Sequence, residues 1–276
     1  MFRVTKRLVS TSPRPWVSVV IPIKDERDNV TPLTEQLRKT LAAAPNSRSA
    51  EFEIIYIDDG STDGSSQILE NLSLIYTEVK VLHFDQSYGQ TSALDVGFHH
   101  ADGELIVTMD GDLQLDPVDI LTLLPLATRY DLVCGWRKDR HDNIVRKISS
   151  RIANGVRSSI TGDRAHDTGC SLKVFRRSVI ERMVLFEGMH RFFPVLALMH
   201  GFTVTEVPVR HYPRAHGVSK YGVGNRVFKG LYDLFAVRWM QSRCLRYRLR
   251  QDTSAIYGLS NDPMFNVPVP QSPNPH

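Results

Sequence analysis

The sequence predicts an α/β fold in which a mostly parallel central sheet is flanked by helices. Short runs rich in Val and Ile recur along the first half of the chain, and segments of helical period lie between most of them. Because these runs are apolar on both faces, they fit strands that are buried between two helix layers. Polar residues also cluster directly after three of the runs, where α/β sheets of this kind bind their ligands.

Five strands are expected in chain order, at residues 16–21, 53–57, 79–84, 105–109 and 131–134. Pro22, Lys24, Asp25 and Glu26 follow the first of them. The acidic segment 58–63 follows the second strand, and an Asp-Gly-Asp sequence follows the fourth. The carboxyl ends of parallel strands meet at one edge of a sheet, so we expect these three polar groups to converge on one crevice.

Composition excludes several classes of protein. The 276 residues are 42% hydrophobic and 23% charged, with a net charge of +4, which is ordinary globular usage. The aromatic-basic interleaving of RNA-binding modules is missing, so we expect no nucleic-acid partner. Three cysteines without metal-like spacing indicate reduced thiols in a cytoplasmic protein. The longest apolar run, 192–199, is far shorter than the ~20 residues that cross a bilayer, and the N-terminus lacks the apolar core of a secretion signal.

Asp110 and Asp112 flank Gly111 just past the strand predicted at 105–109. Their side chains point the same way if the chain stays extended, and Gly111 allows a bend without steric penalty if it turns. Either geometry presents carboxylate oxygens to Mg²⁺ or Mn²⁺, which would take its other ligands from water and substrate phosphates. A solvated turn is the alternative interpretation of the pair.

The segment 58–63, Asp-Asp-Gly-Ser-Thr-Asp, also has two interpretations. Its side chains can cap a helix that begins near Asp63, as in many strand-to-helix turns. A carboxylate past a strand end can equally accept hydrogen bonds from a nucleobase or a ribose. The occurrence of both acidic motifs, each after its own strand, favours a nucleotide-sugar site.

Together these motifs resemble family 2 glycosyltransferases of the GT-A fold, and more closely the dolichol-phosphate mannosyltransferase-like branch that includes polyprenyl-phosphate glucosyl- and aminoarabinosyl-type enzymes. The resemblance rests on Val-Ser-Val-Val-Ile-Pro at 17–22 with Glu26 and Asn29, Ile-Asp-Asp-Gly-Ser-Thr-Asp at 57–63, Tyr-Gly-Gln at 88–90 and Asp-Gly-Asp-Leu-Gln at 110–114. Later motifs are Gly-Trp-Arg at 135–137, Asp167, Gly-Cys at 169–170, Lys-Val-Phe-Arg-Arg at 173–177, His-Arg-Phe at 190–192, and Arg214 with Gly217, Ser219, Lys220 and Tyr221. Two positions depart from the family pattern: Asp25 and Ser87 each stand where Asn is usual.

The resemblance implies a GT-A, Rossmann-like nucleotide-diphospho-sugar transferase fold and a set of site residues. The divalent ion, Mg²⁺ or Mn²⁺, would be held by Asp110, Asp112 and Gln114. Residues implied for the nucleotide are Pro22, Lys24, Glu26, Asp58, Gly89, Gln90 and Asp110. Residues implied for catalysis are Asp112, Arg137, Arg214 and Lys220. Stabilisation of the leaving nucleoside diphosphate would be the main catalytic contribution.

The acceptor is inferred from the chemistry of the nucleophile. A sugar hydroxyl needs a general base, whereas a phosphomonoester, with a second pKa near ~6, is already mostly ionised at neutral pH. Many hydroxyl-glycosylating relatives carry a Glu-Asp dipeptide that supplies the base, and this sequence has none. Asp167 remains a fallback base, with a structural turn role as the alternative. Candidates for binding an acceptor phosphate by guanidinium are Arg137, Arg140, Arg151, Arg191 and Arg214.

Four segments are expected along the chain: an N-terminal extension at 1–15, the catalytic domain at 16–225, a basic amphipathic helix at 226–250 and a disordered tail at 251–276. The helix carries seven basic residues and one acid, Asp233. It can lie on an anionic membrane leaflet, and packing of its first half against the domain is equally compatible with its ragged apolar stripe. Residues 217–224 are expected to form a lid, with a plain surface loop as the alternative.

The sequence therefore predicts a cytoplasmic enzyme, peripheral on the inner face of the plasma membrane and not secreted. It would transfer a hexose with inversion from GDP-mannose or UDP-glucose to a polyprenyl or dolichyl phosphate, and it could form a homo-oligomer. One alternative is a family 2 transferase that acts on a saccharide hydroxyl in cell-surface polysaccharide synthesis. The other is a non-catalytic module that binds nucleotide sugars.

Overall fold

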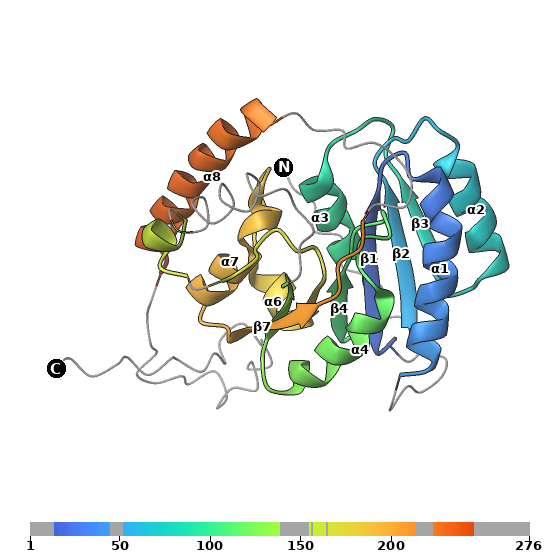
Figure 1. Cartoon of the computed structure of the whole chain (residues 1–276), viewed down its shortest axis with the longest axis horizontal. Helices are drawn as coiled ribbons and strands as arrows, with labels where there is room; N and C mark the ends of the chain where they lie inside the picture. The colour runs from blue at the N-terminus through green and yellow to red at the C-terminus, as the bar shows by residue number, and fades with distance from the viewer. Residues whose placement is uncertain are drawn as a thin grey trace, which may run out of the picture.

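The structure is a computed structural model that describes residues 14–44, 52–138, 155, 157–163, 165–213 and 223–245. Within these residues one sheet of seven strands forms the centre of the fold, in the spatial order β3-β2-β1-β4-β6-β5-β7 (Figure 1). The strands are β1 (Val17–Ile23), β2 (Phe52–Asp58), β3 (Val79–His83), β4 (Leu105–Thr108), β5 (Leu132–Arg137), β6 (Lys173–Arg176) and β7 (Val204–Val209).

The sheet is mixed but mostly parallel, as the sequence predicts. β1 pairs in parallel with β2 and β4, and β5 pairs in parallel with β7. β6 lies between β4 and β5 and is antiparallel to both. The five strands expected from the sequence are β1 to β5, whereas β6 and β7 were not predicted.

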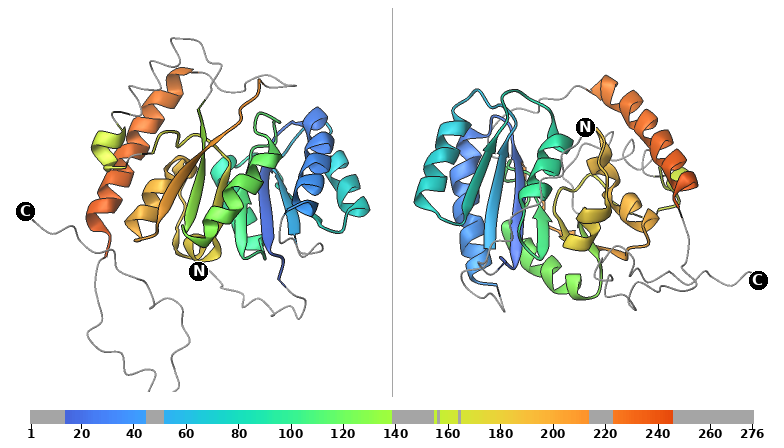
Figure 2. Two further views of the ribbon diagram at one scale, coloured as in Figure 1. Left: turned by 60° about the horizontal axis from the view of Figure 1, so that its bottom comes forward. Right: turned by 180° about the vertical axis from the view of Figure 1, so that it is seen from behind.

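Helices cover both faces of the sheet (Figures 1 and 2). The α-helices are α1 (Arg27–Ala42), α2 (Ser65–Ile75), α3 (Gln90–His100), α4 (Ile120–Leu123), α6 (Arg177–Arg182), α7 (Phe193–Met199) and α8 (Val223–Arg243). The short 3₁₀ helices are η1 (Pro117–Asp119), η2 (Leu124–Thr128) and η3 (Met189–Phe192).

Two apolar clusters fill the space between the sheet and its helix layers. Alternate β1 residues such as Val19 and Ile21 pack with Leu33 and Leu37 of α1, because side chains alternate along a strand. Val20 points to the other face and belongs to a second cluster with Phe98 of α3, Phe193 of α7 and Leu234 of α8. Helix α8 is therefore part of the core on that side, at the edge of the fold farthest from α1 and α2 (Figures 1 and 2).

The helix expected at 226–250 is present as α8, which begins three residues earlier and is described as far as Arg243. Of the lid expected at 217–224, residues 217–222 lie outside the described residues and residues 223–224 begin α8. The tail at 251–276 and nearly all of the N-terminal extension also lie outside the described residues. The boundary between catalytic domain and C-terminal helix at residue 225 stays a prediction. None of the described helices is long and apolar enough to cross a membrane.

Candidate functional site

The loops after β1 and β2 are joined by hydrogen bonds, and one of the side chains involved is Lys24, which the resemblance assigns to the nucleotide. The Lys24 ammonium donates to the carbonyl oxygen of Gly60. Asp25 Oδ1 accepts from the Thr62 amide at 2.7 Å, and the Asp25 amide donates to Ser61 Oγ at 2.9 Å. Asp25 adopts a positive φ of 50°, a conformation that Asp and Asn tolerate better than most residues. The predicted convergence of the first two strand ends is therefore present.

Asp58, the expected nucleoside contact, is buried and already bonded through both oxygens. Oδ1 accepts from the Ser61 amide at 2.9 Å, while Oδ2 accepts from Ser66 Oγ at 2.5 Å and lies 3.0 Å from His83 Nδ1. Burial opposes ionisation of Asp58, but these hydrogen bonds outweigh it and lower the pKa of the carboxyl below 3.8. The turn-stabilising role is thus evident in the structure, and a contact with nucleoside stays a prediction.

Asp59, which the sequence analysis did not single out, fixes the loop before α3. Oδ1 accepts from the backbone amides of Tyr88 and Gly89 at 2.6 and 3.1 Å, and Oδ2 accepts from Ser87 Oγ at 2.7 Å. The departure from Asn at Ser87 therefore preserves a side-chain donor. Adjacent Asp residues at a strand end point to opposite faces, which could have signalled two separate roles.

Asp110 links this loop to the end of β4. The amide group of Gln90 donates to Asp110 Oδ1 at 2.9 Å, and the Asp110 backbone amide donates to Ser171 Oγ at 3.1 Å. Burial raises the pKa of Asp110, and the nearby negative charge of Asp112 raises it further. Contact with Ser171 and the positive charges of Arg137 and Lys173 act in the opposite direction.

The chain bends after Asp110 and does not stay extended. Gly111 lies against Ile23 of β1 so closely that a Cβ atom would collide with the Ile23 Cδ1 methyl group. Its φ is not positive, so close packing explains this glycine better than the backbone freedom that the sequence analysis invoked. The positive φ falls instead on Leu113, at 57°, between Asp112 and Gln114. Non-glycine residues in this region are strained, and such strain is concentrated at functional sites.

Asp112 and Gln114 are held beside each other after the bend. The backbone amide of Gln114 donates to Asp112 Oδ1 at 3.2 Å, and the side-chain amide of Gln114 donates to the carbonyl oxygen of Tyr212 at 3.4 Å. No group of three or more His, Cys, Asp or Glu side chains that could hold a metal occurs among the described residues. Two carboxylates that repel each other, with one amide, fit a hard cation that takes its remaining ligands from water and a diphosphate.

Arg137 ends β5 and is paired with Asp167. Nε and Nη2 of Arg137 donate to the two carboxylate oxygens at 2.7 and 3.0 Å. Burial opposes the guanidinium charge, but this pairing outweighs it and raises the pKa of Arg137. Because both oxygens of Asp167 serve Arg137, its structural role is supported over its use as a base.

Comparison with known proteins identifies the family. Residues 18–184 match the model of glycosyl transferase family 2. The chain belongs to glycosyltransferase family 2. The transferase is 38% identical, over 242 residues, to dodecaprenyl-phosphate galacturonate synthase of Rhizobium johnstonii. This alignment covers 85% of this chain and 68% of the relative. It is 39% identical, over 221 residues, to undecaprenyl-phosphate 4-deoxy-4-formamido-L-arabinose transferase of Edwardsiella ictaluri, over 79% of this chain and 66% of the relative.

The chain spans about two thirds of the length of these relatives. Among solved structures, TarS 1–349 of S. aureus in complex with UDP-GlcNAc is similar with a TM-score of 0.56 and 19% identity, over 81% of this chain and 66% of that one. Glucosyl-3-phosphoglycerate synthase of Mycobacterium tuberculosis, solved with Mn²⁺, UDP-glucose and phosphoglyceric acid, has a TM-score of 0.58 and 13% identity, over 84% and 81%. At these identities the likeness establishes the shared GT-A fold.

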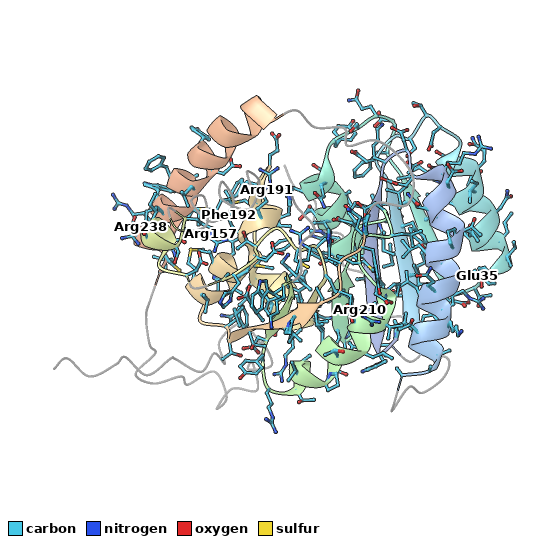
Figure 3. All side chains as sticks on the ribbon, viewed as in Figure 1. Glu35, Arg157, Arg191, Phe192, Arg210 and Arg238 are labelled. Carbon is cyan, nitrogen blue, oxygen red and sulfur yellow. The ribbon has the colours of Figure 1, made fainter. Side chains whose placement is uncertain are left out.

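The transferase thus brings together much of the predicted site. Pro22 of β1 pairs with Ile57 of β2, and the Glu26 carboxylate accepts from Asn29 at 2.6 Å. Gly89 is the N-cap residue of α3, and Gln90 is its first residue. Arg191 lies in η3, between α8 and α3 in the view of Figure 3. Four predicted residues lie outside the described part of the chain: Arg140, Arg151, Arg214 and Lys220.

Lys173 is a site residue of the transferase that the sequence analysis left without a role. It is 2% exposed at the start of β6, where its ammonium donates to the carbonyl oxygen of Cys170, and its charge lowers the pKa of Asp110. A lysine that begins an apolar strand is almost never buried without a partner. The position of a lysine at the start of an apolar strand could therefore have identified Lys173 from the sequence.

Proposed function

We propose that the transferase moves a sugar, with inversion, from a nucleotide sugar to a polyprenyl phosphate. The observation that carries the proposal is the placement of Asp110, Asp112 and Arg137 at the carboxyl ends of β4 and β5, which run in the same direction on either side of β6, with Asp167 paired to Arg137. The lipid-phosphate acceptors in the names of the two relatives support the same acceptor class.

Departure of a nucleoside diphosphate requires that its charge be neutralised. Asp110, Asp112 and Gln114 would hold Mg²⁺ or Mn²⁺, and a bound ion would stabilise the leaving diphosphate as a Lewis acid. Gln90 orients the Asp110 carboxylate toward the end of β4 through its 2.9 Å hydrogen bond. Arg137 keeps its charge at any physiological pH, so it can attract a phosphate without being deprotonated.

A phosphate acceptor removes the need for a general base. The acceptor oxygen is already ionised at neutral pH, and the protein has to bind and orient an anion. Asp167, the fallback base for a hydroxyl acceptor, is 8% exposed at its side chain and serves Arg137 with both oxygens. This pairing favours the lipid phosphate over a saccharide hydroxyl.

The donor sugar class is inferred from the relatives together with the sequence. The sequence predicts mannose or glucose, whereas the two relatives are named for galacturonate and 4-deoxy-4-formamido-L-arabinose. Asp25 replaces the usual Asn in the loop that would receive the nucleoside, where its Oδ1 accepts from the Thr62 amide and its backbone amide donates to Ser61 Oγ. We therefore propose a nucleotide-linked hexose, hexuronate or amino-pentose as the donor class.

A direct assay incubates the purified chain with polyprenyl phosphate and each of four radiolabelled donors. These are GDP-mannose, UDP-glucose, and the uridine diphosphate donors of galacturonate and of 4-deoxy-4-formamido-L-arabinose. We expect label to enter the organic phase with at least one donor, only with Mg²⁺ or Mn²⁺, and to disappear in Asp112→Asn. Asp95→Asn, an exposed carboxylate of α3, is the matched control. Glycolipid formation that persists in EDTA would contradict the metal role, and binding of nucleotide without turnover would indicate a non-catalytic module.

A further inference from the structure

Helix α8 packs on the catalytic fold through one of its faces. Leu234 and Val237 are 4% and 0% exposed and belong to the apolar cluster beneath α3 and α7. Farther along the same face, the Gln241 side-chain amide donates to the carbonyl oxygen of Thr161 at 2.8 Å. Cys244, just past the helix end, contacts the carbonyl oxygen of Met199 at 3.4 Å. These contacts fix how the helix is rotated.

The opposite face of α8 carries three large aromatic side chains in solvent. Tyr232, Phe235 and Trp239 are 78%, 64% and 64% exposed. Their spacing of three and four residues places them on one stripe of a helix, turned away from Leu234 and Val237. Figures 1 and 2 show α8 along the outer edge of the fold, with the short helical segment 157–161 beside its C-terminal half. We call this stripe the outer aromatic face.

The charges around the outer aromatic face are positive. Arg238 and Arg243 are exposed, and Figure 3 shows Arg238 at the outer edge of the helix. The only acid in α8 is Asp233, which is 7% exposed and lies against Gly188 on the packed side. The face therefore combines Trp, Tyr and Phe with arginines and presents no carboxylate to the outside.

We propose that the outer aromatic face docks the transferase on the surface of an anionic bilayer. Trp and Tyr prefer the boundary between headgroups and acyl chains, and flanking arginines are attracted to anionic lipids. A helix with this arrangement lies in the plane of the interface and does not cross it. The docking itself is argued from α8 alone. Its use rests on the proposed function, because a lipid-linked acceptor has to be reached at a membrane surface.

Co-sedimentation with vesicles tests the docking without donor or acceptor. The probes are vesicles of phosphatidylcholine alone and of phosphatidylcholine mixed with phosphatidylglycerol. We expect binding to the anionic vesicles and a loss of at least about tenfold in the partition coefficient for Phe235→Ser with Trp239→Ser. The matched control is Leu74→Ser with Ile75→Ser, two exposed aliphatic residues at the end of α2, which should bind like the unmodified protein.

The charge contribution has its own variant. Arg238→Gln with Arg243→Gln should weaken binding to anionic vesicles by about fivefold per arginine and leave binding to phosphatidylcholine unchanged. All substituted side chains are exposed, so circular dichroism and melting temperature should be unaffected. Equal binding of the Phe235/Trp239 and Leu74/Ile75 variants, or no binding of the unmodified protein, would overturn the proposal. A dimer that dissociates in the Phe235/Trp239 variant, without vesicle binding, would assign the face to a second copy instead.

Glycolipid formation with detergent-dissolved acceptor separates this proposal from the proposed function. Lost vesicle binding with intact glycolipid formation would refute docking alone. Intact vesicle binding with no glycolipid from any donor would refute the proposed function alone.

Discussion

Arg137 and Asp167 form a two-point ion pair, with Nε to Oδ2 at 2.7 Å and Nη2 to Oδ1 at 3.0 Å. The Arg137 backbone amide also donates to Asp167 Oδ2, at 3.3 Å. Glu206 of β7 holds the loop that carries Asp167, because its carboxylate accepts from the backbone amide and Nδ1 of His166. The His166 ring stacks on Trp136 at 4.6 Å between centroids. Arg137 is thus held in one orientation, where its positive charge opposes the rise in the pKa of Asp110.

Replacing the Arg137 guanidinium by an ammonium group should lower activity strongly. Arg137→Lys keeps the charge but cannot make two parallel bonds to Asp167, so the position of the charge near Asp110 is lost. We expect kcat/KM for glycolipid formation to fall by about 10²-fold. Arg38→Lys is the control and should retain activity, because the Arg38 guanidinium on α1 pairs with Glu78, the residue before β3. Normal kinetics in Arg137→Lys would remove Arg137 from the site.

Asp167→Asn separates positioning from base catalysis. If Asp167 only positions Arg137, its replacement should lower kcat/KM by only about tenfold, because Arg137 would be held less firmly. The pH profile should then keep its shape. A general base would instead cost about 10²–10⁴-fold, with loss of one limb of the profile. Measuring kcat/KM against pH for both proteins distinguishes the two roles.

The ligand-free protein should become more stable when Asp110 loses its charge. The pKa of Asp110 is raised by burial and by Asp112, so its ionised form is disfavoured on folding and costs free energy at neutral pH. Asp110→Asn should therefore add about 1 kcal/mol to the free energy of unfolding. For a chain of this size that raises the melting temperature by about 2–4 °C. Activity should be lost in the same variant, and a lower melting temperature would contradict the assignment.

Removal of the Asp58 charge should have the opposite effect and lower the stability of the protein. Its folded pKa lies below the ordinary value of 3.8, so its contribution is fully present above that pH and is lost as pH falls through the folded pKa. Asp58→Asn should lower the free energy of unfolding at neutral pH by about 2 kcal/mol. The difference between the two proteins should shrink below pH 3.8 in urea titrations. A constant difference at all pH values would show that the carboxylate charge is irrelevant.

Close packing at Gly111 predicts a rescue. Gly111→Ala should displace the Asp110–Asp112 bend, because its methyl group would meet Ile23 Cδ1, and activity should fall by about 10²-fold. Ile23→Val removes that Cδ1 atom and alone costs about 1 kcal/mol of stability. In the double variant we expect kcat/KM to recover by at least about tenfold over Gly111→Ala. Absence of recovery would locate the constraint in the backbone.

The sequence predicts the parallel half of the sheet because β1, β2 and β4 are rich in Val and Ile and are followed by polar residues. β6 and β7 were missed for local reasons. β6 is four residues long and begins and ends with a charge, and β7 contains Glu206 and Pro208, which weaken a strand pattern. Both strands form through long-range pairing with β5, which periodicity does not report.

The site was predicted in outline and not in its internal bonds. Convergence of the strand ends followed from topology, which brings Asp58 and Asp110 to one edge. The bond between Gln90 and Asp110 and the hydrogen bonds to the Asp59 carboxylate depend on loop conformation. Gly111 was assigned to backbone freedom because its neighbour in space, Ile23, is distant in sequence.

Acceptor chemistry is tested most directly by a pair of lipids that differ by one phosphate. Purified protein with Mn²⁺ and its active donor should glycosylate polyprenyl phosphate and leave the polyprenol of the same chain length unmodified. The product should be a phosphodiester that mild acid cleaves, releasing the sugar. Transfer to polyprenol or to a soluble saccharide at a comparable rate would contradict attack by an ionised phosphate and, with it, the proposed function.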